Sequence, residues 1–127
     1  MYNALICRTK TIALSEALEI SLNPALLLSG KEIKSIGLVN LKPNLAAKLL
    51  SAKGALMQCL SAVNVTFNDY TAVTIAHDNL GKPYFQFNQS LRFMLYEKGV
   101  LDVFLSISDE KIVAFSYVVL KLDREKV

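Results

Sequence analysis

Apolar residues recur at three- and four-residue steps between Leu45 and Leu60, and this spacing predicts one long amphipathic helix in the middle of the chain. Pro43 suits the first turn of that helix, because the N–H that a proline lacks would have no partner there. Lys48 and Lys53 are expected on the polar side. The apolar stripe is formed by Leu45, Leu49, Leu50, Leu56, Met57 and Leu60. Such a stripe needs a second apolar layer to pack against.

That second layer is predicted by the strand patterns on both sides of the helix. Tyr2–Lys10 is typical of a first strand, and Tyr70–His77 with Pro83–Phe87 is typical of a hairpin that turns at Asp78–Lys82. A second hairpin pairs Val100–Ser108 with Lys111–Leu120, whose last strand is apolar on both faces and therefore expected to be central. The other expected elements are a helix over Ser15–Ser21, a helix from a capping box at Ser29–Glu32 to near Val39, and a helix over Gln89–Lys98 that stops at Gly99. The fold class is therefore α+β, with an antiparallel sheet and packed helices.

The composition predicts one globular domain, spanning residues 1–127. A hydrophobic fraction of 53% against 20% charged residues leaves surplus apolar surface, which favours an oligomer. No apolar run reaches a membrane span and the first residues lack the layout of a signal peptide, so we expect no membrane association and a cytoplasmic protein. The basic residues are dispersed and the net charge is only +3, which argues against nucleic acid as a partner.

Several residues that could serve chemistry are expected to be structural. Cys7 and Cys59 have neither zinc-site nor disulfide spacing and are expected to pack as small hydrophobic residues. His77 could act as a general base, but it has no acid partner at motif spacing, so a structural or solvated role is the interpretation we favour. We assign the following residues to the core or an interface: Met57, Met94, Tyr84, Phe85, Phe87 and Phe93.

Three short motifs follow one another between Lys53 and Lys111. Lys53-Gly54-Ala55 lies in the long helix, and Gly81-Lys82-Pro83 follows at a distance of 28 positions from Lys53 to Gly81. Ser106–Lys111 ends a strand, and Leu28–Glu32 precedes all three. In order and spacing, these motifs resemble the holo-acyl-carrier-protein synthases of the 4'-phosphopantetheinyl transferase superfamily. The resemblance covers roughly residues 25–122.

The resemblance implies a trimer of small α+β protomers whose active sites are shared between neighbours. It implies transfer of phosphopantetheine from coenzyme A to a serine of an acyl carrier protein, with magnesium neutralising the phosphoryl charge. Lys53 would touch phosphate or assist proton transfer, as a residual catalytic residue. The residues that would bind the cofactor are Lys53, Gly81, Lys82, Pro83, Ser108 and Arg8.

The sequence departs from this family at both expected metal ligands. The resemblance implies an aspartate near the end of the first strand and a glutamate directly after the helix lysine. Those positions are occupied by Cys7 or Arg8 and by Gly54, and residues 1–15 and 33–68 contain no Asp or Glu. Because magnesium prefers carboxylate and phosphate oxygens, we expect no metal site. An arginine at that place could itself contact a phosphate.

Other departures affect the nucleotide and the carrier protein. The family's glycine-rich loop after the helix is replaced by Ser61-Ala62-Val63, the following helix lysine by Gln58, and a preceding arginine by Leu49. The first helix, which in the family would grip an acidic carrier, contains Glu16 and Glu19, with no lysine or arginine between Lys10 and Lys31. Like charges would repel a typical acidic carrier.

Two functional hypotheses remain. We favour a degenerate member that is weak or inactive as a transferase and acts as a partner in a fatty-acid or polyketide carrier-protein pathway, as a homo-oligomer or in a mixed oligomer with an active paralogue. In that case Lys53 is a solvated helix lysine, and Lys82, Asp109 and Glu110 only shape turns. The alternative is an active 4'-phosphopantetheinyl transferase that uses coenzyme A and magnesium, in which Asp69, Asp78 or a neighbour's carboxylate supplies the metal.

Overall fold

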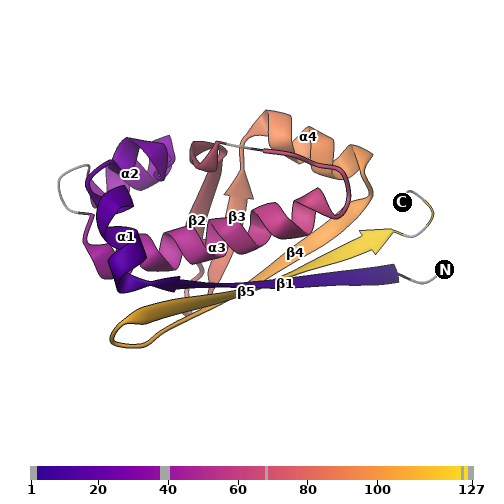
Figure 1. The fold of residues 1–127 in the computed structure, drawn as a ribbon. Helices are drawn as coiled ribbons and strands as arrows, with labels where there is room; N and C mark the ends of the chain where they lie inside the picture. The colour runs from indigo at the N-terminus through magenta and orange to yellow at the C-terminus, as the bar shows by residue number, and fades with distance from the viewer. Residues whose placement is uncertain (1–2, 38–40, 68, 124, 126–127) are drawn as a thin grey trace.

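A computed structural model describes residues 3–37, 41–67, 69–123 and 125 of the chain. Within these residues, the longest helix lies at the centre, between a three-stranded sheet on one side and shorter helices on the other (Figure 1). No helix in the described segments is both long enough and apolar enough to cross a membrane. The elements in order are β1 (Asn3–Ala13), α1 (Leu14–Ser21), a 3-10 turn (Pro24–Leu26), α2 (Gly30–Ile36), α3 (Pro43–Ser61), a 3-10 turn (Tyr70–Ala72), β2 (Val73–His77), β3 (Pro83–Phe87), α4 (Gln89–Glu97), β4 (Val100–Asp109) and β5 (Val113–Asp123).

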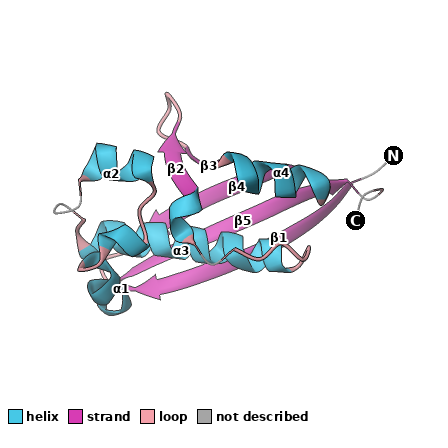
Figure 2. Cartoon of the chain, turned by 90° about the horizontal axis from the view of Figure 1, so that it is seen from above, coloured by secondary structure: helices cyan, strands magenta, loops and turns pink. Residues whose placement is uncertain are grey.

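The strands form two antiparallel sheets. The larger sheet has the order β1-β5-β4, and β2 pairs with β3 as a separate hairpin. The expected α+β class with antiparallel sheets and packed helices is confirmed, as is the central place of the last strand. Figure 2 shows α3 running across the larger sheet, with the β2–β3 hairpin and α4 on the β4 side.

Helix α3 covers one face of the larger sheet and forms the core with it. Ala52, Ala55, Leu56 and Leu60 on the helix are all 0% exposed. Since side chains alternate along a strand, every second residue of the sheet points to this core. Those that are buried are Ile12, Leu105, Ala114, Ser116, Val118, Leu120 and Leu122.

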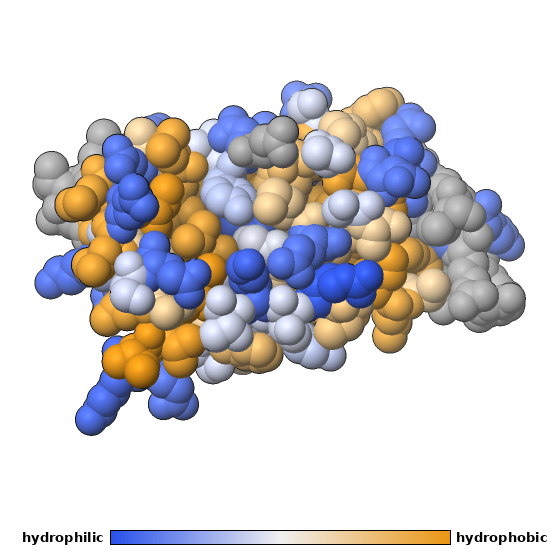
Figure 3. Space-filling view, in the orientation of Figure 1, coloured by the Kyte–Doolittle hydropathy of each residue, from blue (hydrophilic) through white to orange (hydrophobic). Residues whose placement is uncertain are grey.

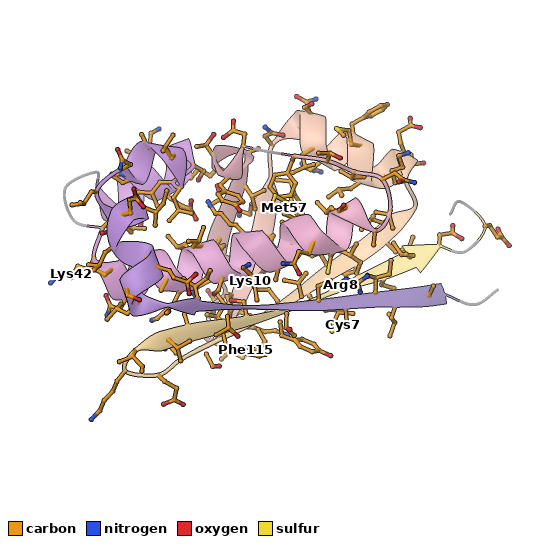
Figure 4. The ribbon with its side chains drawn as sticks, in the orientation of Figure 1. Cys7, Arg8, Lys10, Lys42, Met57 and Phe115 are labelled. Atoms are coloured by element: carbon orange, nitrogen blue, oxygen red, sulfur yellow. The ribbon has the colours of Figure 1, made fainter. Side chains whose placement is uncertain are left out.

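The opposite face of the sheet has no helix over it in the described part of the chain (Figure 1). Large apolar side chains are nevertheless exposed there, among them Leu5 at 68%, Phe104 at 45%, Phe115 at 40% and Tyr117 at 43%. Figure 4 shows Cys7 and Phe115 on this outer side of the sheet. This outer face of the sheet therefore accounts for part of the surplus apolar surface that the composition indicated.

The structure corrects three expectations about single elements. β1 continues to Ala13, three residues beyond the expected end, because β5 offers pairing partners as far as Val113. The expected strand start at Tyr70 is a 3-10 turn, whose first residues are held by the Asp69 side chain accepting a hydrogen bond from the Thr71 amide at 2.9 Å. α2 ends at Ile36, and Val39 lies outside the described residues.

The two cysteines differ in environment. Cys59 is buried, as expected, and burial raises the pKa of its thiol to about 11. Cys7 is exposed on the outer face of the sheet, so its expected packing as a small hydrophobic residue is wrong for this protomer. The reason is the strand alternation, which turns Cys7 away from α3 and turns its neighbour Arg8 toward it.

Candidate functional site

Lys53 of α3 is completely buried, at 0% exposure. Its ammonium group donates three hydrogen bonds, to the Glu32 carboxylate at 2.6 Å, the Leu27 carbonyl at 2.7 Å and the Tyr70 carbonyl at 3.0 Å. Burial lowers the pKa of Lys53, and the Glu32 carboxylate opposes that shift. The expectation of a solvated lysine on the polar side of the helix is therefore wrong.

Glu32 is the second half of this buried pair. One carboxylate oxygen accepts hydrogen bonds from Lys53 and from the Ser29 amide at 2.9 Å, and the other accepts from the Ile75 amide at 2.9 Å. The capping box at Ser29 is thus confirmed and serves a further purpose, because the same glutamate joins α2, α3 and β2. A lysine ammonium has three N–H donors. All three are used here, so Lys53 in this arrangement has none left for a phosphate.

Gly54, the next residue on α3, faces the first strand. A Cβ atom at this position would lie 3.4 Å from Cγ of Lys10 and 3.9 Å from its Cδ and Cε. The same part of the interface is joined by a hydrogen bond of 2.6 Å between the hydroxyls of Ser51 and Ser116, and Ser116 is the strand partner of Lys10. The glycine therefore leaves room for the aliphatic stem of Lys10 to lie along the helix.

Lys10 is the residue of β1 that faces Gly54, whereas the sequence placed Cys7 or Arg8 at the expected metal-ligand position of this strand. Cys7 points to the other side of the sheet (Figure 4). Neither β1 nor α3 contains an aspartate or glutamate. In the described residues, no group of three or more histidine, cysteine or acidic side chains could hold a metal ion. A lysine where a carboxylate ligand would be needed does not fit Mg²⁺, which requires oxygen ligands.

Arg8 and Lys10 instead give the contact between β1 and α3 near Gly54 a positive charge. Both lie on the side of β1 that faces α3 (Figure 4). One guanidinium nitrogen of Arg8 donates to the Cys7 carbonyl at 2.7 Å, and neither side chain belongs to either of the ion pairs that the described residues form. Figure 3 shows hydrophilic surface along the line between α3 and β1, where Figure 4 labels the two residues. Arg8 is exposed, Lys10 is half-buried and Gly54 is buried beneath the Lys10 stem. We use the name β1–α3 groove for the line of contact between β1 and α3 at these three residues.

The Gly81-Lys82-Pro83 motif lies in another part of the protomer. Gly81 has a φ of +83°, and the Asp78 carboxylate holds the turn by accepting from the amides of Leu80 and Lys82, both at 2.9 Å. Lys82 and Pro83 line a shallow pocket with β4 residues from Phe104 to Ile107. β4 and β1 are the two outer strands of the larger sheet, so this motif and the β1–α3 groove lie at opposite edges.

Ser108, Asp109 and Glu110 lie at the β4–β5 turn and are exposed. Asp109 forms an ion pair of 3.7 Å with Lys48 of α3, and the Glu110 amide donates to the Val113 carbonyl at 2.8 Å. Both contacts hold the turn. The structure thus distributes the expected cofactor-binding residues over four places in one protomer and does not bring Ser108 or Lys82 to Lys53.

The turn after α3, where the resemblance implies a glycine-rich loop, is closed by an asparagine. Asn64 adopts a left-handed backbone conformation, with a φ of +62°, and the Val65 amide donates to the Leu60 carbonyl at 2.9 Å. This pattern is a common helix ending in which asparagine substitutes for glycine. Val63 and Val65 are buried, so the loop is fixed by packing.

We expect Gly54→Ala to raise the free energy of unfolding by up to about 1 kcal/mol, because alanine is the better helix former and the new Cβ would make an ordinary van der Waals contact with Lys10. Urea denaturation followed by circular dichroism measures the change. Gly99→Ala is the matched control, since Gly99 has a φ of +77° and alanine there should be destabilising. A destabilised Gly54→Ala variant would contradict the described contact with Lys10.

Two residues of this site were missed by reasoning from sequence. Lys10 was taken as the end of the strand, although the β-branched Thr11 and Ile12 behind it were a signal that the strand continues. With a longer strand, Arg8 and Lys10 fall on the same face. Glu32 was taken only as a capping residue, and nothing in the sequence pairs it with Lys53 across 21 positions.

Comparison with curated proteins identifies relatives of this chain, although no family model matches it. The chain is 36% identical over 75 residues to a holo-(acyl-carrier-protein) synthase of Nitrosomonas eutropha, which covers 59% of this chain and 60% of that protein. It is 34% identical over 98 residues to the enzyme of the same name from Vibrio parahaemolyticus, which covers 75% of each. The chain thus spans about 60% of the length of the first of these relatives.

Solved structures give the same result at the level of the fold. A crystal structure of holo-(acyl-carrier-protein) synthase from Neisseria meningitidis matches with a TM-score of 0.78 and 26% identity, covering 90% of this chain and 95% of that one. The Plasmodium yoelii acyl carrier protein synthase with ADP bound matches with a TM-score of 0.77 and 22% identity, covering 97% and 99%. A synthase–coenzyme A complex described as from Chronobacterium ammoniagenes has a TM-score of 0.75 at 17% identity, covering 95% and 99%. The described fold, its motifs and these relatives together show that the chain belongs to the holo-acyl-carrier-protein synthase family.

Proposed function

We propose that this chain is a degenerate holo-acyl-carrier-protein synthase that is weak or inactive as a magnesium-dependent transferase and acts as a partner in a carrier-protein pathway. The observation that carries the proposal is the packing of Lys10 against Gly54 in the β1–α3 groove. Two carboxylates would be needed on these two elements, and neither element has one.

The chemistry explains why this loss matters. Moving phosphopantetheine from coenzyme A to a serine breaks a pyrophosphate bond while negative charge builds on the phosphoryl oxygens. A bound metal stabilises that charge by several kcal/mol and orients the attacking and leaving oxygens. Lys10 can supply one positive charge but no coordination sites, so it cannot orient these oxygens as a metal does.

The proposed partner role is supported by the uncovered face of the larger sheet. Leu5, Phe104, Phe115 and Tyr117 expose apolar surface there, and surface of this kind commonly marks an interface. We propose that this face is covered in an oligomer, either a homotrimer or a mixed assembly with an active paralogue. In such an assembly the β1–α3 groove of one protomer could meet the Lys82 hairpin of its neighbour.

The surface of α1 favours a partner other than a typical acidic carrier protein. Glu16 and Glu19 are exposed on this helix, next to Leu18 at 53% and Leu22 at 81% exposure. Figure 3 shows hydrophobic surface interleaved with hydrophilic surface around this helix. A carrier that docks here must tolerate the two negative charges.

The second candidate function is active transfer of phosphopantetheine from coenzyme A to a dedicated, less acidic carrier. It is favoured by relatives of the same fold whose structures contain coenzyme A or ADP. The acids suggested for its metal are engaged elsewhere, because Asp78 holds the hairpin turn and Asp69 binds Thr71 through a backbone and a side-chain hydrogen bond. A carboxylate from a neighbouring protomer is then its remaining source of a metal ligand.

Mass spectrometry separates the two candidates. The protein is incubated with coenzyme A, magnesium and a panel of apo carrier proteins, and the carriers are examined for added phosphopantetheine. We expect transfer about 100-fold or more below that of the Vibrio parahaemolyticus relative under the same conditions, given the several kcal/mol that the metal supplies. Transfer at a similar rate would reject the proposal that this chain is weak or inactive as a transferase.

Co-purification from the native cell tests the partner claim separately. We expect the chain to bring down a transferase homologue or a carrier protein, identified by mass spectrometry. Recovery of homo-oligomers alone would contradict the partner role without bearing on catalysis.

A further inference from the structure

The β1–α3 groove contains a cation in the place where a metal ion would need ligands. The Lys10 stem lies against Gly54, with 3.4 Å from its Cγ to the position of a Cβ. Residues two apart on a strand share a face and are about 7 Å apart, so Arg8 lies next to Lys10 along the same groove. Figure 4 shows both on the side of β1 that faces α3.

No ion pair among the described residues neutralises the charges of Arg8 and Lys10. β1 and α3 contain no acidic residue, and of the two lysines on α3, Lys53 is buried against Glu32 and Lys48 is paired with Asp109. Arg8 uses one guanidinium nitrogen on the Cys7 carbonyl and keeps its other donors. Two cations without a carboxylate repel a divalent cation and attract an anion.

We infer that the Lys10 ammonium takes the place of the divalent cation, so that the β1–α3 groove binds the diphosphate of a coenzyme A-type nucleotide without metal. The inference rests on the proposed function, since it concerns the ligand of the same site. The replacement of glutamate by glycine gives Lys10 the space to lie along α3, and the replacement of aspartate by lysine supplies the charge. Arg8 adds a planar donor set that suits phosphate oxygens.

Isothermal titration calorimetry tests the inference with three probes, namely coenzyme A, inorganic pyrophosphate, and pantetheine as a ligand without phosphate. We expect coenzyme A and pyrophosphate to bind in the presence of EDTA, with less than about a twofold change in Kd when magnesium is added, and pantetheine not to bind. Lys10→Met should weaken both phosphate ligands about tenfold or more, because a charge-assisted hydrogen bond is lost.

Lys42→Met is the matched control, because Lys42 is an exposed lysine at the far end of α3 from the groove (Figure 4). This variant should bind as the wild type does, and unchanged thermal unfolding of both variants shows that each is folded. A requirement for magnesium, a lack of pyrophosphate binding, equal binding of pantetheine, or no effect of Lys10→Met would each overturn the inference.

The outcomes also separate this inference from the proposed function. If nothing binds in EDTA but the chain still co-purifies with a carrier or a transferase, the inference fails and the partner role stands. If phosphopantetheine is transferred efficiently in EDTA, metal-free binding of coenzyme A is supported, and the proposal that the chain is weak or inactive as a transferase fails. Efficient transfer that needs magnesium rejects both.

Discussion

Replacing Glu32 with glutamine is expected to lower the free energy of unfolding by about 3–5 kcal/mol. Glutamine keeps the shape of the side chain but removes the negative charge that lies 2.6 Å from the buried Lys53 ammonium. The lysine would then be an uncompensated charge inside the core. Since small domains are stable by about 5–15 kcal/mol, this one change removes a large part of the total. Urea denaturation at neutral pH measures it.

The exposed ion pair of Lys48 with Asp109 is the control for this prediction. Its atoms are 3.7 Å apart and its side chains are 36% and 47% exposed, so Asp109→Asn should cost less than about 1 kcal/mol. The double variant Glu32→Gln, Lys53→Met should recover part of the loss, because no charge stays buried. If Glu32→Gln costs no more than Asp109→Asn, the buried pair described here is contradicted.

The paired substitution Lys10→Asp, Gly54→Glu is expected to create a divalent-metal site between β1 and α3, two elements that have no carboxylate of their own. It places one carboxylate on β1 and one on α3 at positions that face each other, since a Cβ at position 54 would lie 3.4 Å from Cγ of Lys10. Manganese should then bind in about the millimolar range or tighter, detected by electron paramagnetic resonance. Binding to the folded state should raise the thermal midpoint as manganese is added.

The two single variants are the controls for the metal site. Lys10→Asp supplies only one carboxylate, and Gly54→Glu places its carboxylate beside Lys10, where the two charges neutralise each other. Neither should bind manganese comparably. Manganese binding by the unaltered protein at the β1–α3 groove, or equal binding by the single variants, would contradict the assigned geometry.

Much of the fold was predictable because it follows local patterns. The stripe from Leu45 to Leu60 gave the length of α3, Pro43 its first residue, and the capping box the start of α2. The turn at Asp78–Lys82 was predicted from its residue types. The end of β1 was missed because it depends on pairing with β5 and not on the local sequence.

The composition of the site could be read from the sequence, but its geometry could not. The missing carboxylates could be read directly, whereas the identity of the residue facing Gly54 depends on strand alternation over a strand of unknown length. The environment of Lys53 could not be read, because a lysine in a helix is usually exposed and its burial depends on Glu32, Leu27 and Tyr70 converging from three separate segments.

Crystals of the protein grown with coenzyme A and manganese, measured at the manganese absorption edge, would locate any metal ion directly. We expect no anomalous peak between β1 and α3, and we expect the Lys10 ammonium to lie within hydrogen-bonding distance of a phosphate oxygen. A manganese ion between these two elements, held by acidic side chains of this protomer or a neighbour, would contradict it.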